Sequence, residues 1–444
     1  MDEVKKRENK IRFFCQNVGL NTKLSMALMG LGSIRLGQIG RGICYLLIEV
    51  LFILYMIFWG GHDFVGFFTL GTKVSDPWLN ISGDNSVIFM LRGIIAIGII
   101  CIFILCYIEN IKDCYHNEAR LKASHKIPTF KDDLNSLFGK NFYKLAIFIP
   151  LIGVLAFNVL PIIFMIFIAF TNYGGDIVPP KLVDWVGFAN FVKIFSIGNV
   201  GSTFFKIFGW NILWAVMSTC VNYFLGLGLA LLLNKKCVKG KAFWRSFPVL
   251  AYAVPGFITL LAFKFMFSYG GPINYYIDFL GGKKIGFLDI DSKWVARFIG
   301  LGVNAWLNVP TSMLLATGLL SNLDKSMYEA AEIDGASKFC QFRKLTLPFI
   351  IFATTPTLIS QFVGNFNNFG IFYFLRDGIT SKDYFLASNT DLLINWLYNL
   401  SLGSTIKYYG IAGAVSLIIF IFTSVISLTV YVRSNAYKKE DTYR

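Results

Sequence analysis

The sequence predicts an all-α, polytopic membrane protein. Of its 444 residues 55% are hydrophobic and 15% are charged, whereas a soluble protein of this length carries about a quarter charged residues. Apolar runs long enough to cross a bilayer as helices recur along the chain. We therefore predict about eight transmembrane helices, at residues 43–61, 88–108, 145–170, 207–233, 245–268, 295–319, 349–373 and 410–432.

Basic residues gather on one side of these spans. The segments on that side hold 27 Lys/Arg and 14 Asp/Glu, and the loops on the other side hold 10 and 11. The positive-inside rule places the basic side, with both termini, in the cytoplasm. The net charge of +15 is then a signal for membrane insertion, and the expected surroundings are a lipid bilayer, with no nucleic acid. The basic segments are 1–42, 109–144, 234–244, 320–348 and 433–444.

Two domains are predicted from the spacing of the spans. Residues 1–144 contain two spans and end in a charged cytoplasmic linker, and residues 145–444 contain six spans that follow each other more closely. The external loop 171–206 includes "VPPKLVDWVGFANFVKIF", which favours a small cap with a short amphipathic helix on the membrane. The external loop 374–409 includes "SNTDLLINWLYNLSLG", for which we predict a second short surface helix.

Charged residues within the spans are few, and they lie near the predicted ends. Glu49, Arg92, Lys264 and Arg297 are interpreted as interface anchors, because long side chains near a helix end can extend to the membrane surface. An ion-coupled carrier commonly needs an acidic group or a broken-helix cation site at mid-depth. The acid present, Glu49, is close to the inner end of its span, which disfavours such a carrier but leaves it as an alternative.

Uncharged amides mark two helical faces within the spans. "GVNAWLNVP" places Asn304 and Asn308 four residues apart, and "QFVGNFNNFG" places Gln361, Asn365 and Asn368 at i, i+4 and i+7, so each set is expected on one face of its helix. Phenylalanines form the stripe beside the second set, at Phe362, Phe366 and Phe369.

These stripes allow two interpretations. Amides donate and accept hydrogen bonds, and aromatic faces cover sugar rings, which suits a neutral polyhydroxyl substrate. Asn and Gln also join helices within a bilayer, so a purely structural role is the alternative for each amide. In the fifth span, "AYAVPGF" adds Tyr252 and a Pro255–Gly256 break, which is tolerated where a helix lines a cavity or packs on protein.

The sequence predicts neither catalysis nor a metal site. The three histidines form no HExxH, the cysteines at 106 and 114 are too far apart for CxxC, and no GxxxxGK[ST] loop is present. We expect no catalytic residue, no bound metal and no cofactor in this chain.

The loop at 320–348 is longer and more polar than a connection between adjacent spans needs. "SMYEAAEID" contains good helix formers, Gly335 is a natural stop, and "ASKFCQFRKLTL" can form a second short helix before Pro348. A helix–turn–helix that projects into the cytosol is predicted. From the residues alone, a solvated helical connector is the alternative to a docking element.

The same loop resembles the EAA signature of permease subunits of bacterial ABC importers. Glu329-Ala330-Ala331 is followed by Gly335 after three residues and, nine residues further on, by Leu345-x-Leu347-Pro348. From about residue 145 to 444 the motifs "AYAVPGF", "NAWLNVP", "GNFNNFG" and "NTDLLINWLY" are similar to those of MalF-like maltose/maltodextrin permeases. The resemblance implies a six-helix ABC permease core with a cytoplasmic coupling helix, and the eight-span count agrees with that family.

The resemblance also implies roles for individual residues. A coupling helix would sit in a groove of a cytoplasmic ATPase. The residues assigned to this coupling are Glu329, Ala330, Ala331, Asp334, Gly335, Leu347 and Pro348. The positions implied to contact the sugar are Tyr252, Gly256, Asn304, Leu307, Asn308, Gln361, Asn365 and Asn368.

By this resemblance the chain is a subunit of an oligosaccharide importer in the bacterial cytoplasmic membrane, working by alternating access, with an α-glucan favoured. Its implied partners are a second, homologous permease, two ATPase subunits that bind ATP and Mg, and an extracellular solute-binding protein. The loop 171–206 lacks the large insertion of the enteric maltose permease. Gly256, Asn308 and Gln361 stand at positions where that permease has other small or polar residues. Another neutral glycan, such as a galacto-oligosaccharide, is therefore the first alternative, ahead of an ABC permease for another solute class and the ion-coupled carrier.

Overall fold

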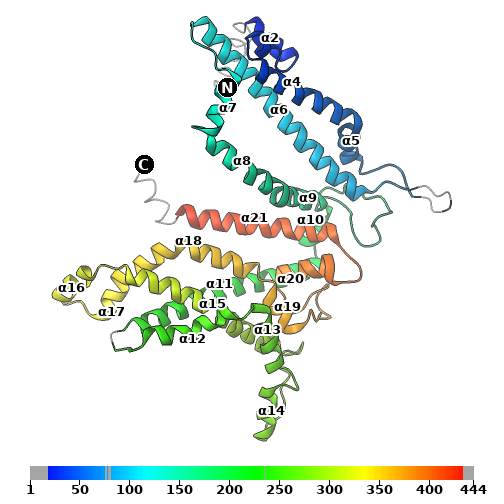
Figure 1. Cartoon of the computed structure of the whole chain (residues 1–444). Helices are drawn as coiled ribbons and strands as arrows, with labels where there is room; N and C mark the ends of the chain where they lie inside the picture. The colour runs from blue at the N-terminus through cyan, green and yellow to red at the C-terminus, as the bar shows by residue number, and fades with distance from the viewer. Residues whose placement is uncertain (1–18, 76–77, 79–81, 236, 434–444) are drawn as a thin grey trace. The chain divides into compact units, whose positions relative to one another are not determined.

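The computed structural model describes residues 19–75, 78, 82–235 and 237–433, apart from the side chain of Tyr252. Within these residues the secondary structure is helical, apart from two isolated β-bridges, Thr171–Trp185 and Gly174–Ile177. The chain divides into two compact units, Met1–Trp185 and Val186–Arg444 (Figure 1). Each unit is described by itself.

The first unit contains three helical stretches long and apolar enough to span a membrane, Ile39–Thr69, Ser86–Lys122 and Phe142–Ile168. The first and third each include one π-helical turn. The helices of this unit are α2 (Leu20–Ala27), α3 (Leu31–Arg35), α4 (Ile39–Tyr55), η1 (Met56–Gly60), α5 (Gly61–Thr69), α6 (Ser86–Lys122), α7 (Phe130–Phe138), α8 (Phe142–Val154), η2 (Leu155–Val159) and α9 (Leu160–Ile168).

Apolar side chains from α5 and α6 form the core of this unit. Phe67 and Leu70 pack with Met90 and Ile94, and Val183 from the loop after α9 closes the cluster. Residues of α9 pack on the same cluster. The third span therefore belongs to the first unit, because it shares this core.

The α2–α3 turn is held by polar groups on α4 and α6. Gly30 has φ +80°, and a Cβ there would lie 2.1 Å from the carbonyl oxygen of Gly42, so only glycine fits. The Gly30 amide donates to Asn110 Oδ1 (3.0 Å), and the neighbouring Met29 amide donates to Glu49 Oε2 (2.7 Å). Glu49 thus satisfies a backbone amide of the turn.

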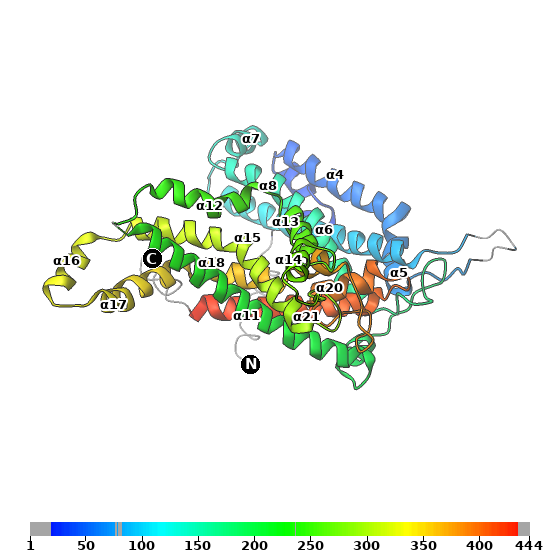
Figure 2. The ribbon, with the colours of Figure 1, turned by 90° about the horizontal axis from the view of Figure 1, so that it is seen from below.

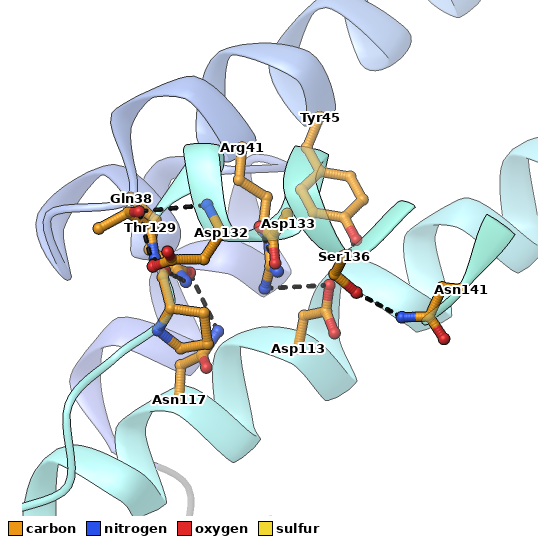
Figure 3. A network of polar contacts seen from close by, with 11 residues as sticks. Gln38, Arg41, Tyr45, Asp113, Asn117, Thr129, Asp132, Asp133, Ser136 and Asn141 are labelled. Atoms are coloured by element: carbon orange, nitrogen blue, oxygen red, sulfur yellow. Dashed lines mark hydrogen bonds and ion pairs between the residues drawn. The ribbon is translucent and has the colours of Figure 1, made fainter. Parts of the chain in front are cut away.

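A polar brace joins α4, α6 and α7, and Figure 3 shows it from close by. Arg41 forms ion pairs with Asp133 (2.5 Å) and Asp113 (3.6 Å), and Tyr45 donates to Asp113 (2.8 Å). Thr129 and Asp132 form a capping box at the start of α7, and the hydrogen bonds to the Thr129 amide and hydroxyl lower the pKa of Asp132. The brace comprises Gln38, Arg41, Tyr45, Asp113, Asn117 and Asp133.

The second unit contains four further candidate spans and one bent helix pair. Its helices are α10 (Ala189–Phe195), α11 (Asn199–Asn234), α12 (Lys241–Ala253), α13 (Gly256–Met266), α14 (Pro272–Phe279), α15 (Lys293–Ser321), α16 (Lys325–Ile333), α17 (Lys338–Gln341), η3 (Phe342–Thr346), α18 (Leu347–Phe366), α19 (Gly370–Arg376), α20 (Leu393–Tyr398), η4 (Asn399–Gly403) and α21 (Tyr409–Arg433).

Helix α11 lies beside α15, α18, α12 and α20 (Figures 1 and 2). Two apolar clusters surround it. One joins Trp214 to Phe372 and Leu392, and the other joins Tyr223 to Met313. The long helix is buried along much of its length because it is the common neighbour of the others.

Two spans of this unit are broken. Residues 241–251 and 256–266 meet at 82°, with Pro255 at the break, where its ring and missing amide end the helical ladder. The seventh span stops at Phe366 and restarts at Gly370. The outer pieces, α13 and α19, pack together, and Lys264 Nζ lies 2.6 Å from Asp377 Oδ2.

The structure confirms the all-α class and, within the described residues, seven candidate spans plus the bent pair, in agreement with eight. The chain divides into its two compact units between residues 185 and 186, because the third span packs on α6. The assignment of 145–444 as the functional permease core stays a prediction.

Two local predictions were wrong. The segment at 393–398 does form a short helix, but Leu393 and Trp396 are fully buried, so it is not a surface helix. Arg297 is 7% exposed, lies 3.6 Å from the Trp210 ring centroid and donates to the Asn389 carbonyl (2.7 Å). It is therefore a buried group and not an interface anchor.

Candidate functional site

The predicted helix–turn–helix at 320–348 is present as α16 and α17. Asp324 caps α16 by accepting from the Ser326 amide (2.9 Å), and hydrogen bonds to Ser326 lower the pKa of Asp324. Ser337 caps α17. Gly335 has φ +75°, the left-handed geometry that glycine adopts without strain. The hairpin is thus specified by two caps and one glycine.

This hairpin exposes the residues expected to contact an ATPase. It projects beyond the ends of α15 and α18 (Figure 2). Ile333 is 87% exposed and Phe339 is 72% exposed. Most of the predicted coupling positions are exposed, with Ala331 and Leu347 half-buried: Glu329, Ala330, Ala331, Asp334, Gly335, Leu347 and Pro348.

One hydrogen bond ties the two arms of the hairpin. Tyr328 on α16 and Thr346, at the start of the seventh span, have hydroxyl oxygens 2.7 Å apart. Gln341 Nε2 also donates to the Ala336 carbonyl (3.2 Å). These contacts make α16 and the seventh span neighbours despite the intervening turn.

The predicted amides come together between α11, α15 and α18. Asn365 Nδ2 donates to Thr219 Oγ1 (3.1 Å), and Asn304 Nδ2 donates to Asn365 Oδ1 (3.4 Å). Asn308 Nδ2 donates to Asn304 Oδ1 (3.0 Å), and Gln361 Nε2 donates to Ser312 Oγ (3.1 Å).

Burial divides this amide network, which comprises Thr219, Asn304, Asn308, Ser312, Gln361 and Asn365. Asn304 and Asn365 are 0% and 6% exposed, whereas Asn308 and Gln361 are half-buried. Gln361 Oε1 has no partner among the described residues. Interhelical bonding therefore accounts for the two buried amides in this conformation, and the half-buried pair retains accessible surface for a ligand.

The sequence predicted that Asn368 continues the stripe of Gln361 and Asn365 on one helix, but the structure shows that it does not. It lies in the break after α18, and its Oδ1 accepts from the Ile371 amide (3.1 Å) at the start of α19. Asn211 Nδ2 donates to the Phe366 carbonyl (3.0 Å), and Asn395 Nδ2 donates to the Phe369 carbonyl (2.8 Å). Side-chain amides thus replace backbone bonds that the break removes.

The remaining predicted sugar positions are placed differently. Gly256 is exposed at the start of α13. Leu307 packs against the core cluster around Trp214, which makes it partly structural. Tyr252 belongs to α12, but its side chain lies outside the described residues.

A third polar cluster joins the loop that precedes α15 to the loop that follows α19. Arg376 donates to Thr390 Oγ1 (2.7 Å), Asn389 Oδ1 (2.8 Å) and the Leu288 carbonyl (3.0 Å). Asp391 is 5% exposed and accepts from the Ser388 amide (2.8 Å). Burial raises the pKa of Asp391 to about 6, against the lowering effects of the Ser388 hydrogen bonds and of Arg376.

Several polar residues of these clusters were not predicted. Asn211, Ser218 and Asn222 are buried on α11 at spacings of seven and four, and this polar face was readable in the fourth span. Ser312 and Thr219 gave no comparable signal, because hydroxyls in a membrane helix often bond their own backbone.

Together, the spans, the broken helices and the exposed hairpin define a multi-pass membrane permease. Residues 222–436 match the family described as "Binding-protein-dependent transport system inner membrane component". The chain is also 33% identical over 422 residues to the maltodextrin transport system permease protein MdxF of Bacillus subtilis, covering 93% of this chain and 95% of that protein. The chain therefore belongs to this family of transport-system permeases, and it is a multi-pass protein of the cytoplasmic membrane.

Two other relatives define the breadth of the family. The galactooligosaccharides transport system permease protein GanP of Bacillus subtilis is 33% identical over 421 residues, covering 93% of this chain and 96% of that protein. The maltose/maltodextrin permease MalF of Escherichia coli is 33% identical over 261 residues, or 58% of this chain and 50% of that protein.

Among solved structures, the bacterial ABC transporter that imports the acidic polysaccharide alginate matches with a TM-score of 0.52 and 20% identity. The match covers 67% of this chain and 97% of that chain. At this level of identity the match establishes a shared fold.

Proposed function

We propose that the chain passes an oligosaccharide of the maltodextrin class into the cytoplasm by alternating access. Its partners in this proposal are a second, homologous permease, two ATPase subunits that bind ATP and Mg, and an external solute-binding protein. Both termini and the α16–α17 hairpin face the cytoplasm, on the side with 27 Lys/Arg against 10 on the other.

The observation that carries this proposal is 33% identity to a maltodextrin permease over 93% of the chain. The exposed α16–α17 hairpin supports it independently, because Ile333 and Phe339 are apolar side chains that a docked ATPase would cover. The neutral amide network supports a polyhydroxyl substrate, since amides exchange hydrogen bonds with hydroxyls without desolvating a charge.

In this mechanism the hairpin transmits movement and the amides bind sugar. Closure of the ATPases displaces α16, and the Tyr328–Thr346 bond carries that displacement to the seventh span. Asn308 and Gln361 then bind sugar hydroxyls, while Asn304 and Asn365 hold the helices that carry them. Gln361 Oε1, which is buried and without a partner among the described residues in this conformation, becomes an acceptor when the helices move apart. No covalent step on the sugar is involved.

A galacto-oligosaccharide is the second candidate substrate, because GanP matches with the same identity and coverage of this chain as MdxF. Uptake by the complete complex in proteoliposomes, with its binding protein and ATP, separates the two. We expect maltodextrins to be imported and galacto-oligosaccharides of equal length to be imported at least tenfold more slowly. The reverse order selects the second candidate, and ion-driven uptake without an ATPase contradicts both.

Coupling is tested at Gly335. Gly335→Asp places a charged side chain at a left-handed turn of the hairpin and should lower ATP-driven uptake at least tenfold, with reduced recovery of the ATPase in co-purification. Gly378→Asp is the matched control, because Gly378 also has positive φ (65°) and open space around a Cβ but lies outside the hairpin. Equal losses in both variants would mean that backbone strain, not docking, is responsible.

A further inference from the structure

Five aromatic rings form a continuous row across the two helix breaks. Phe257 lies 6.4 Å from Phe374, which lies 5.3 Å from Tyr373 (ring centroids). Tyr373 stacks on Phe369 at 4.5 Å, and Phe369 lies 5.0 Å from Tyr398. The row joins α13, α19 and α20, which Figure 1 shows as neighbours.

Two rings of the row directly follow predicted sugar positions in the sequence. Phe257 follows Gly256 directly, and Phe369 follows Asn368 directly. One end is therefore next to the break of the fifth span, and the fourth ring is next to the break of the seventh. A ligand that reached either position would meet these rings.

Phe374 packs in part against the core cluster around Trp214, but the row as a whole is not core. On α19, Ile371, Phe372 and Leu375 are the side chains that face the core, each at most 2% exposed. The five rings of the row are half-buried, except Phe257, which is 51% exposed. Their accessible faces are thus available to something other than this chain.

Lipid is a poor occupant for this surface. The hydroxyl oxygens of Tyr373 and Tyr398, both half-buried, lie 3.5 Å apart. Partly exposed hydroxyls are disfavoured against acyl chains. Alternating ring faces and hydroxyls suit the apolar faces and the hydroxyl groups of a sugar ring.

We propose that this aromatic row is a second glycan subsite, which binds sugar units beyond those held by the amide network and favours longer chains. This inference rests on the proposed function. A row of several rings can accompany more than one sugar unit, whereas the amide network offers few exposed polar groups.

The test uses the complete complex in proteoliposomes and a series of α-glucans from disaccharide to heptasaccharide. In Tyr373→Leu and Tyr398→Leu, which keep apolar bulk but lose the ring, uptake of the longest chains should fall by about tenfold. Disaccharide uptake and basal ATP hydrolysis should stay within twofold. Tyr398→Phe, which keeps the ring, should retain long-chain uptake.

Tyr276→Leu is the matched control, because this tyrosine is 64% exposed on α14 and lies outside the row. Equal loss for all chain lengths, or equal loss in Tyr398→Phe and Tyr398→Leu, overturns the subsite. If the wild-type complex imports neither α-glucans nor galactans, the proposed function is overturned and this inference with it. If the wild-type complex imports α-glucans but the leucine variants show the same dependence on chain length, this inference alone is overturned.

Discussion

The brace of the first unit and the amide network of the second are both polar clusters that join helices, but they differ in charge. In the brace, Arg41 is paired with Asp133 and Asp113. In the amide network, neutral groups are bonded at 3.0 to 3.4 Å, and Gln361 Oε1 has no partner among the described residues.

This difference separates a fixed joint from an exchangeable one. Charge-assisted bonds are stronger than neutral ones, so a neutral ligand displaces them less readily. Neutral amides are bonded weakly enough for a sugar hydroxyl to replace one partner at little net cost. Similar polar side chains thus brace one unit and, in the proposed function, bind substrate in the other.

The largest expected effect is on transport through the amide network. Asn365→Ala removes both bonds of the central amide and should lower uptake at least tenfold, together with a loss of about 1–3 kcal/mol of stability. Uptake in proteoliposomes and thermal inactivation in detergent measure the two effects.

Thr219→Val is its control. It removes the bond from Asn365 Nδ2 but no amide, so stability should fall while uptake stays within threefold. If both variants lose uptake in proportion to stability, the network is only structural.

The cluster around Arg376 and Asp391 adds a third case to this comparison, because its charged groups are buried and belong to a loop and the end of a short helix. The pKa of Asp391, about 6, is above its ordinary value of 3.8. Between pH 3.8 and 6, the loop therefore binds more protons when it is folded than when it is locally unfolded. Its stability should therefore rise as the pH falls from 7 toward 4, by at most about 3 kcal/mol.

Hydrogen exchange of the amides at 388–392, corrected for intrinsic rates, measures this at pH 7.5 and 5.5. Protection should be greater at the lower pH, and Asp391→Asn should abolish the difference. Protection that falls on acidification contradicts the assignment.

The smallest expected effect is in the brace. Arg41→Met removes two partly exposed ion pairs and should destabilise by about 1 kcal/mol. Uptake per assembled complex should stay within twofold. Arg120→Met, an exposed arginine on α6, is the control for thermal inactivation, and a selective loss of uptake in Arg41→Met would give the brace a role in transport.

Much of the architecture could be predicted from the sequence. Span positions follow from hydrophobic length, and the fifth-span break follows from Pro255. The hairpin follows from its helix formers and Gly335. Each of these depends on local chemistry, which a single sequence contains.

Features that depend on distant partners could not be predicted. The break after Phe366 occurs without proline and is stabilised by Asn211 and Asn395, which lie far away in the sequence. The burial of Trp396 and Arg297 depends on packing against other segments. The roles of the individual amides in sugar binding and of the hairpin in docking stay predictions.

The Tyr328–Thr346 bond has a mechanical consequence. It ties α16 to the start of the seventh span, so the chain from α15 through the hairpin to α18 is closed by a side-chain contact. In the proposed function, a displacement of the hairpin would therefore reach α15 and α18 together, and with them the Asn304–Asn365 pair that joins these two helices.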